Sequence, residues 1–426
     1  MKHLKRAFCA LLAAAIITVL FTGCNDGADA NKTSITFLNS KGEIQSALEQ
    51  VAKSYEEKTG VRVEVIAAAT GTSPFERISA MYNSGTPPTM AMLDATDIVT
   101  LYKEKALDLS EEKWVADAGN QIYTINGKVY SFPMGVEGKG LIYNKTAVEK
   151  ALGRAFDPAS INTLTKLKAL FQQLSDKGLT PCVITNEDWS LGAHYLGMLY
   201  QAQSENLEDV TAYIEKLKNG EIQVASDKRF QELMDVFDLL KNNNINKSDP
   251  LASEYAMDPV NLADGDVAFW FNGNWAWTNL EDFIQENTEF GLMPVPLNDD
   301  TGDFANSILL GAASKQIMID RVKATPEQQQ AAKDFLNWFV YDADGQKAMV
   351  DSLSLVPAFS NISLQPADPL SKAIQDYVNA GKTNKDPIVP ADHWSVLGEA
   401  MQRYLAGRLD RAGLAAAIEN YWKNQE

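Results

Sequence analysis

A short apolar run, followed by a glycine turn and two tryptophans, carries the clearest chemical signal in the chain. The run Val267–Phe271 is rich in β-branched and aromatic residues, which predicts a strand buried on both faces. The next residues, Asn272-Gly273-Asn274, are typical of a tight turn, and Asn274 is a good N-cap for a helix over 275–283. The pattern therefore predicts a strand that ends in a turn, with a helix leaving from it.

Trp275 and Trp277 stand where a ligand would bind if this strand belongs to an open α/β sheet. In such sheets, ligands bind just outside the carboxyl ends of the strands, and both side chains flank that position. The alternative is that every aromatic residue of this stretch is core. We take that alternative for Phe269, Trp270 and Phe271, which a buried strand needs, and favour a binding role for Trp275.

The composition is that of an acidic globular protein with more than one domain. Its 426 residues exceed what a single core usually supports, and 45% hydrophobic with 22% charged residues is ordinary for a globular chain. A net charge of −18 argues against nucleic acid or an anionic bilayer as a partner. The cysteines, Cys9, Cys24 and Cys182, lack metal-ligand spacing, and we predict neither a metal nor a cofactor.

The N-terminus has the layout of an export signal. Basic residues precede the apolar segment 7–21, which is short for a membrane span. The segment ends in Leu20-Phe-Thr-Gly-Cys24, which resembles the lipobox of bacterial lipoproteins. That resemblance implies a signal peptide over 1–23, lipidation of Cys24 and a tether over 24–33. The alternative is an ordinary secretory signal with a chance cysteine.

The rest of the pattern predicts an α/β chain. It opens with a strand at 34–38, a helix at 42–58 and a strand at 61–66, and such a β-α-β start implies a right-handed crossover and parallel pairing. Asn126-Gly127 between two apolar runs predicts a hairpin. Further strands are expected at 89–93, 141–144, 180–185, 290–296 and 306–312, and further helices at 75–83, 164–175, 190–203, 207–218, 228–242, 326–340, 395–405 and 409–423.

Four blocks of sequence, spread in order over nearly the whole chain, carry a family resemblance. They are EKTGVRVEV (57–65), NGKVYSFPMGVEGKGLIYNK (126–145), DGDVAFWFNGNWAWTNL (264–280) and ADHWSVLGEAMQRYLAGRL (391–409). In these blocks the chain resembles the extracellular solute-binding proteins of family 1, the substrate-binding lipoproteins of bacterial ABC sugar importers of the maltose- and raffinose-binding type. The third block is the most specific of the four.

The resemblance implies an α/β fold of the type II periplasmic-binding-protein class, with two discontinuous lobes joined by a hinge. The matching blocks place 34–137 and 272–318 in the N-terminal lobe, and 138–271 and 319–426 in the C-terminal lobe. The connecting segments are then expected near 135–140, 271–273 and 314–320. The glycines at 135, 138 and 140 fit independently, because a hinge must absorb changes in backbone angles.

The function that the resemblance implies is binding of a carbohydrate between the lobes and its delivery to the permease subunits of an ABC importer. The protein is expected to be a monomer, held by its lipid on the extracytoplasmic face of the bacterial cell membrane. Asp392-His393 resembles an acidic-His pair of the raffinose and isomaltose branch, where the pair grips the terminal hexose. An α-linked oligosaccharide of that type is therefore the expected ligand.

The candidate binding residues combine aromatic and planar polar side chains. A neutral sugar needs aromatic faces for its C–H patches, and carboxylates or amides for its hydroxyls. The candidates are Lys41, Asp94, Thr96, Glu137, Trp189, Asn272, Trp275, Asp392, His393 and Trp394. The residues 392–394 have little reason to cluster in a core, so binding is favoured there.

Several candidates also have a structural interpretation. Lys41 could simply be solvated, and Asp94 could cap the next helix. Trp189 is evenly balanced between core and binding. His194 lies on the apolar face of the same predicted helix and is favoured as a core histidine.

Two other classes of protein compete with this interpretation. A glycoside hydrolase could use Glu137 and Asp392 as its carboxylate pair, but the chain has no nucleophile elbow, HExxH motif or glycine-rich phosphate loop, so we predict no enzyme. A lipid-anchored adhesin would not need this arrangement of strands and hinge. Among rival ligands, peptides, polyamines and phosphate stay open, while abundant Trp and scarce His and Cys disfavour metals.

Overall fold

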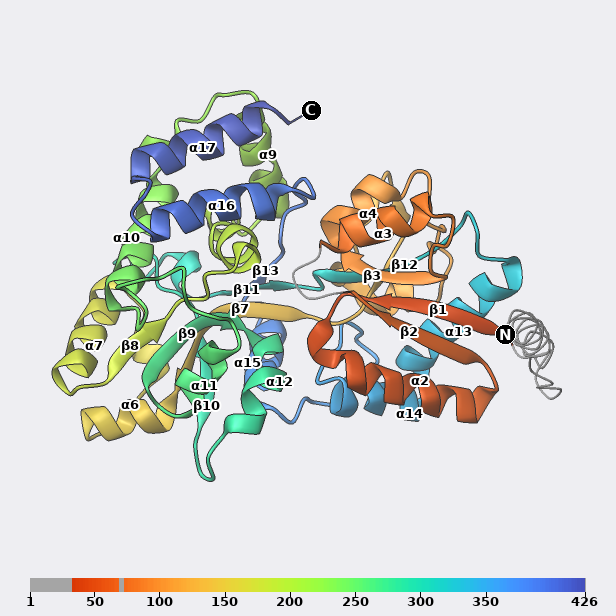
Figure 1. Cartoon of the computed structure of the whole chain (residues 1–426), viewed down its shortest axis with the longest axis horizontal. Coiled ribbons are helices and arrows are strands. Elements are labelled where there is room, and N and C mark those ends of the chain that lie inside the picture. Colours follow the sequence, from red (N-terminus) through yellow and green to blue (C-terminus); the bar gives the residue numbers. More distant parts are fainter. Residues whose placement is uncertain (1–32, 69–72, 426) are drawn as a thin grey trace, which may run out of the picture.

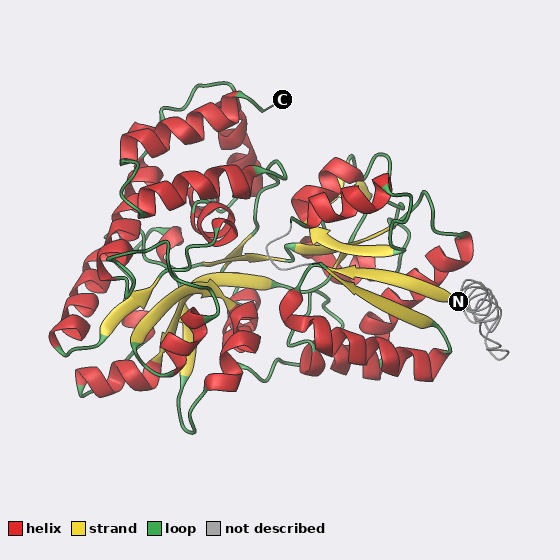
Figure 2. Ribbon diagram, in the orientation of Figure 1, coloured by secondary structure: helices red, strands yellow, loops and turns green. Residues whose placement is uncertain are grey.

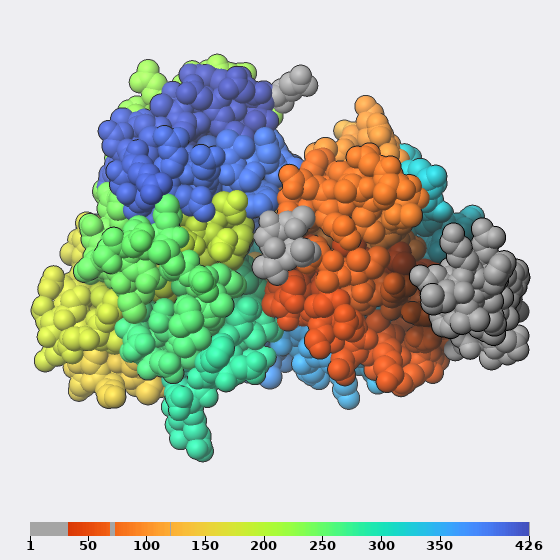
Figure 3. Space-filling model, in the orientation of Figure 1, coloured from red at the N-terminus to blue at the C-terminus, as the bar shows by residue number. Residues whose placement is uncertain are grey.

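Two α/β lobes, each built on its own sheet, make up the folded chain (Figure 1, Figure 2). The computed structural model describes residues 33–68 and 73–425. The predicted signal peptide 1–23, Cys24 and the predicted tether up to residue 32 lie outside this part of the chain. The surface is hollowed between the lobes (Figure 3). The arrangement confirms the predicted two-lobed α/β architecture.

The sheet of the first lobe has the strand order β2-β1-β3-β12-β6. Its strands are β1 (Ser34–Asn39), β2 (Arg62–Ala67), β3 (Met90–Asp94), β6 (Phe132–Pro133) and β12 (Lys315–Ile319). β1 pairs in parallel with β2 and β3, as the β-α-β start predicted. β12 pairs antiparallel with β3 and β6, where the sequence predicted only a connection.

Helices cover both faces of this sheet, and the alternation of side chains along each strand decides which face a residue enters. The helices of this lobe are α2 (Gln45–Thr59), α3 (Pro74–Asn83), α4 (Ala95–Leu101), α5 (Trp114–Ala118), α13 (Pro326–Tyr341) and α14 (Ala343–Lys347). On β1, Ile35 and Phe37 enter a core with α2 and α13, while Leu38 faces α3 and α4. The rings of Phe37 and Phe335 meet edge-on with centroids 6.4 Å apart, which places α13 firmly in this lobe.

The sheet of the second lobe has the order β13-β11-β7-β9-β8, and β10 pairs with the far half of β7. Its strands are β7 (Glu137–Asn144), β8 (Thr180–Val183), β9 (Val267–Gly273), β10 (Phe290–Met293), β11 (Leu309–Ala312) and β13 (Thr383–Asn384). β9 is buried along its whole length between β7 and β8. Phe269 and Phe271 enter one core and Trp270 enters another, so the predicted strand buried on both faces is confirmed.

Most helices of the second lobe pack into one core on one side of this sheet, while α11, α12 and α15 enter the core on the other side. The helices are α6 (Lys145–Leu152), α7 (Leu164–Asp176), α8 (Met198–Gln201), α9 (Leu207–Lys218), α10 (Lys228–Asn243), α11 (Met257–Ala263), α12 (Trp277–Leu280), α15 (Pro369–Asn379), α16 (His393–Leu405) and α17 (Arg411–Lys423), with a π-helical segment, η5 (Trp189–Tyr195). None of the helices in the described part of the chain has the length and apolar character that crossing a membrane requires.

The described chain passes between the lobes at 134–136, 313–314 and 353–368. The first and last of these segments are joined, because the Val136 N–H donates to the Val356 carbonyl oxygen at 2.8 Å. The predicted segments 135–140 and 314–320 overlap the first two positions only at 135–136 and 314, because β7 begins at Glu137 and β12 at Lys315. The predicted crossing near 271–273 is wrong, because β9 stays within the second sheet to its end.

Two predicted lobe ranges are wrong in part for a related reason. β10 and β11 fall in 272–318 but pair with β7 of the second lobe. The helix α13 falls in 319–426 but packs on β1 of the first lobe. Local sequence indicates where a strand or helix forms, whereas the sheet that it joins depends on distant pairing partners.

The predicted hairpin turn at 126–127 is confirmed, whereas the predicted helix cap at Asn274 is wrong. At the hairpin between β4 (Thr124–Ile125) and β5 (Lys128–Val129), Asn126 and Gly127 have φ of 52° and 74°, as a two-residue hairpin turn needs. After β9, the predicted helix over 275–283 is three short pieces, and Asn274 does not cap it. Instead the Asn274 side chain accepts from the Gly138 N–H at 2.9 Å and donates to Ser371 at 3.1 Å, which ties β7 to α15.

Candidate functional site

The ends of β1 and β7 bring together a buried ion pair where the lobes meet. Lys41 follows β1 and Glu137 begins β7, and they are 4% and 8% exposed. Lys41 Nζ donates to Glu137 Oε1 and lies 2.6 Å from Glu43 Oε1. Ser314, in the second connecting segment, donates its hydroxyl to Glu137 Oε2 at 2.8 Å. Glu137 is therefore held both by the first lobe and by a connection between the lobes.

The charges of this pair are set by their mutual attraction. Burial by itself would raise the pKa of Glu137, but the charge of Lys41 and its hydrogen bond outweigh burial and lower that pKa. Burial would likewise lower the pKa of Lys41, and the carboxylates of Glu137 and Glu43 raise it instead. Both groups are thus ionised at neutral pH, and the site holds a fixed carboxylate with a fixed ammonium beside it.

A second charged group lies at the ends of the neighbouring strands. Asp94 ends β3 and Lys315 begins β12, and Asp94 Oδ1 lies 2.7 Å from Lys315 Nζ. Asp97, one turn into α4, accepts from the Asp94 N–H at 3.2 Å. Burial and the charge of Asp94 raise the pKa of Asp97 to about 8, so this carboxyl is largely protonated at pH 7. Thr96 is half-buried beside these groups at the start of α4.

The second lobe contributes a row of half-buried aromatic rings. His194 lies between two tryptophans, with ring centroids 4.7 Å from Trp275 and 5.3 Å from Trp189. Trp189 in turn contacts Tyr255 at 5.3 Å. Burial, together with the positive charges of Lys139, Lys315 and Lys41, lowers the pKa of His194 well below its usual range, so its imidazole is neutral. The row, defined as Trp275, His194, Trp189 and Tyr255, combines flat apolar faces with polar ring edges.

Gly273 allows Trp275 to take its place in this row. A Cβ atom at Gly273 would lie 2.1 Å from Cζ3 of the Trp275 ring, which is closer than any real contact. The indole therefore lies directly over the turn that follows β9. This explains why the turn carries glycine although its φ of −121° suits any residue.

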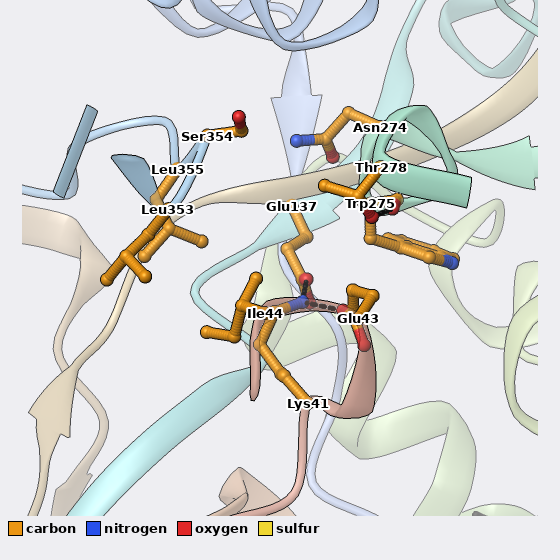
Figure 4. A pocket seen from close by; sticks show the side chains of 10 residues that line it. All are labelled: Lys41, Glu43, Ile44, Glu137, Asn274, Trp275, Thr278, Leu353, Ser354 and Leu355. Carbon is orange, nitrogen blue, oxygen red and sulfur yellow. Dashed lines mark hydrogen bonds and ion pairs between the residues drawn. The ribbon is translucent and has the colours of Figure 1, made fainter. Parts of the chain in front are cut away.

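The Lys41–Glu137 pair and Trp275 of the aromatic row line one pocket between the lobes (Figure 4). Its lining residues are Lys41, Glu43, Ile44, Glu137, Asn274, Trp275, Thr278, Leu353, Ser354 and Leu355. Lys41 and Glu43 come from the first lobe, Trp275 and Thr278 from the second, and Leu353–Leu355 from the third connection. A molecule bound here would touch both lobes and the third connection at once.

The three residues of the predicted cluster at 392–394 lie in different surroundings. His393 is 1% exposed, its Nε2 lies 2.8 Å from the Tyr200 hydroxyl, and burial lowers its pKa to about 3. It is a core residue of the second lobe, contrary to the expectation that this cluster has no reason to be buried. Asp392 is exposed and accepts from the Tyr421 hydroxyl at 2.7 Å. Trp394 is half-buried, and its backbone packs on Gly192 of η5, beside the aromatic row.

The remaining candidates also separate into two groups. Lys41, Glu137 and Trp275 line the pocket. Asn272 is 1% exposed, and its side-chain oxygen accepts from the Gly273 N–H at 2.9 Å, so it supports the turn. Trp277 is not among the residues that line the pocket. Its Nε1 instead donates to Glu281 on the helix surface at 3.0 Å.

Sequence reasoning did not single out some residues that lie near the pocket. His194, favoured as a core histidine, is half-buried between Trp189 and Trp275 and does not line the pocket itself. Tyr255 stands alone in a polar loop and gives no signal. Lys315 lies within the predicted connecting segment 314–320, and its charge there could have drawn attention. Within the part of the chain that the structure describes, no group of three His, Cys, Asp or Glu residues could hold a metal ion.

Two sheets in separate lobes, several connections and a pocket lined from both sides define a two-lobed ligand-binding protein. The model of the bacterial extracellular solute-binding protein family matches residues 50–382, and the chain belongs to that family. Membership makes it a solute-binding protein and not an enzyme, as the sequence predicted.

Similar proteins support this assignment. A multiple sugar-binding protein of Streptococcus mutans is 24% identical over 400 residues, which cover 86% of this chain and 87% of that one. An uncharacterised ABC transporter extracellular-binding protein of Pyrococcus horikoshii is 22% identical over 417 residues, covering 92% and 88%. Among solved structures, the solute-binding protein RafE in complex with raffinose has a TM-score of 0.75 at 20% identity, covering 92% of this chain and 99% of that one. The fold is thus the predicted type II class.

Proposed function

We propose that this protein is the sugar-binding component of a bacterial ABC importer. It would bind an α-linked oligosaccharide of raffinose or isomaltose type between its lobes and deliver it to the permease. The observation that carries the proposal is the pocket in which Trp275 of the second lobe lies opposite Glu137 and Lys41. An aromatic face opposite a carboxylate and an ammonium matches the alternation of C–H patches and hydroxyls on a sugar ring.

Each group of the pocket has a defined task in this proposal. The indole of Trp275 would stack on the apolar face of one sugar ring. Glu137 accepts hydrogen bonds and Lys41 donates them, so together they suit neighbouring hydroxyls of the same ring. Asp94, Thr96 and Trp189 would contact adjoining rings. The backbone carbonyl of Trp394 lies against Gly192 of η5, the segment that carries Trp189 and His194, and on this support we keep Asp392 and Trp394 as proposed contacts.

The relatives support the ligand class. The Streptococcus mutans relative is a multiple sugar-binding protein, and the RafE structure contains raffinose. The Pyrococcus horikoshii relative is an extracellular-binding protein of an ABC transporter, which supports the permease as partner. Closure of the lobes around the ligand would bend the chain at 134–136, 313–314 and 353–368, because these segments connect the lobes.

The test is a thermal-shift screen of a panel of mono- and oligosaccharides, followed by calorimetry on the ligands that raise the melting temperature. We expect raffinose- or isomaltose-type sugars to raise it, and Trp394→Ala and Asp392→Ala each to weaken binding at least tenfold. If no saccharide shifts the melting temperature, the proposed ligand class is wrong. If both variants bind as tightly as the unaltered chain, these two residues do not belong to the site.

We propose further that Cys24 carries a lipid that holds the protein at the outer face of the cell membrane. The support is the order of basic residues, apolar segment and Leu-Phe-Thr-Gly-Cys at the N-terminus. A Cys24→Ala variant should be released to the medium or stay uncleaved in cell fractionation. A correctly cleaved variant that remains bound to the membrane would contradict the anchor.

A further inference from the structure

A segment of the second lobe between β13 and α16, here called the strap and defined as residues 385–391, contacts the first lobe away from the pocket. Lys385 Nζ donates to the Ile122 carbonyl oxygen at 3.3 Å and lies 5.3 Å from the centre of the Tyr123 ring. The Tyr123 hydroxyl in turn donates to the Asp386 carbonyl oxygen at 3.3 Å. None of these residues lines the pocket. The lobes therefore meet at a second place, where each lobe donates one hydrogen bond to the other.

The second lobe fixes its own side of this contact. The Asp386 carboxylate accepts from Lys139 Nζ at 2.6 Å and from Gln201 Nε2 at 2.7 Å. Lys139 belongs to β7 and is only 6% exposed, so this ion pair is well shielded from water. Asn384, in β13, donates to the Gln201 carbonyl oxygen at 3.2 Å. The Asp386 carbonyl oxygen that receives the hydroxyl of Tyr123 is therefore held to the sheet of the second lobe.

The first lobe presents its side from the segment that precedes the hairpin of β4 and β5. Ile122 and Tyr123 lie in this segment, and Gln121 just before them accepts from the Ala313 N–H at 3.3 Å. Ala313 belongs to the connection 313–314, so the contact lies beside a place where the chain passes between the lobes. Because one partner belongs to each lobe, the contact persists only while the lobes keep the arrangement described here.

The contact between the lobes is weaker than the ion pair that anchors the strap. Lys385 is half-buried and forms no ion pair with a carboxylate in the described part of the chain, and burial lowers its pKa. Its ammonium gains a carbonyl oxygen and an aromatic face but loses water. The Lys139–Asp386 pair, by contrast, joins opposite charges within one lobe and stays intact when the lobes move. The structure thus combines a permanent anchor in the second lobe with a releasable contact to the first.

We propose that the strap and Tyr123 form a latch, which favours the lobe arrangement described here while no ligand is bound. This goes beyond the proposed function, because it concerns the protein without its ligand. Loss of the latch makes a more open arrangement more populated, and one hydrogen bond of ordinary strength shifts such an equilibrium about two- to tenfold. The Lys41–Glu137 pair also joins the lobes, so losing the latch shifts the equilibrium without abolishing this arrangement.

The experiment measures the shape of the protein without ligand by small-angle X-ray scattering. A double variant, Tyr123→Phe with Lys385→Met, removes the hydroxyl and the ammonium of the latch and nearly keeps the size of both side chains. Fitting each scattering curve as a mixture of the arrangement described here and a more open one gives the ratio of the two. We expect the latch variant to raise the share of the open arrangement about two- to tenfold relative to the other, with a larger radius of gyration.

A matched double variant serves as the control. Tyr130→Phe with Lys382→Met removes the same two chemical groups from the hairpin and from the loop before β13. The ring of Tyr130 contacts Tyr102 within the first lobe, and Lys382 is exposed, so neither side chain joins the lobes. The control should keep the radius of gyration of the unaltered chain.

An increase of the radius of gyration that is confined to the latch variant supports the latch. An unchanged value for the latch variant contradicts it. An equal increase in the control also contradicts it, because the effect would then not depend on the contact between the lobes. If the latch variant does not fold, Lys385→Met alone tests the same contact, since Lys385 is not a core residue. Sugar binding plays no part in these measurements, so failure of the proposed function would leave their result standing.

Discussion

The two faces of the interlobe pocket are built in opposite ways. One face presents charged groups at the ends of strands, and these groups already pair across the lobes, as Lys41 of the first lobe does with Glu137 of β7 in the second. The second lobe presents Trp275 and the rest of the aromatic row, held by ring contacts. A ligand must compete with existing ion pairs on the first face, whereas on the second it only displaces water. The charged face should therefore govern both stability and binding, and the aromatic face should govern affinity alone.

The largest expected effect comes from breaking the charged face at Glu137. Glu137→Gln removes one of two carboxylates from a buried lysine, and losing a partner of a buried pair costs roughly 3 kcal/mol. We expect urea unfolding to show a loss of that order, and calorimetry to show at least a hundredfold loss of sugar affinity. Glu43→Gln removes the more exposed partner of the same lysine and should cost much less. Equal losses for the two variants would contradict the central position of Glu137.

The aromatic face should respond in affinity alone. Trp275→Ala removes the proposed stacking surface. We expect the dissociation constant to rise ten- to hundredfold, which is a loss of about 1.4–2.8 kcal/mol of binding free energy. Gly273→Ala should act in the same direction, because its methyl group would displace the Trp275 ring. Trp277→Ala is the control, since this side chain lies outside the pocket and its loss should leave calorimetry unchanged. If Trp277→Ala weakened sugar binding as much as Trp275→Ala, the proposed difference between the two tryptophans would be wrong.

The charged face should also make stability depend on pH. The pKa of Asp97 is raised from 3.8 to about 8, so the folded state keeps a proton that the unfolded state releases between these values. The free energy of unfolding therefore falls as pH rises through this window, by at most about 1.4 kcal/mol per pH unit. Asp97→Asn should flatten the profile and stabilise the protein at pH 8. If the free energy of unfolding of Asp97→Asn depended on pH as that of the unaltered chain does, the raised pKa of Asp97 would be refuted.

The smallest effect is expected at His194, on the aromatic face. Its pKa is lowered well below 6.5, so the imidazole is neutral in the folded protein throughout the range from pH 6 to 8. Sugar affinity should therefore show no step near pH 6.5, whereas below that pH the unfolded state gains a proton and stability falls. Calorimetry at several pH values is the measurement. An affinity step near pH 6.5 that His194→Gln abolishes would contradict a neutral imidazole.

Local pattern was sufficient wherever neighbouring residues decide the outcome. The apolar run 267–271 predicted β9, and Asn126-Gly127 predicted its hairpin turn, because backbone preference and alternation act within a few residues. The same pattern failed at Asn274, which resembles a helix cap but bonds to Gly138 and Ser371 from distant segments. Burial of His393 was missed for the same reason, since its partner Tyr200 is far away in sequence.

The sequence by itself determined the elements, the two-lobed class and the family, through the four blocks and the spacing of their apolar residues. It also singled out Lys41, Glu137 and Trp275, which line the pocket in the structure. Only the tertiary structure decided which strands share a sheet, since β10 and β11 join the second lobe by pairing with β7. It alone brought His194 between two tryptophans and α2 alongside the pocket. Such contacts join residues far apart in the chain, and no local preference of either partner specifies them.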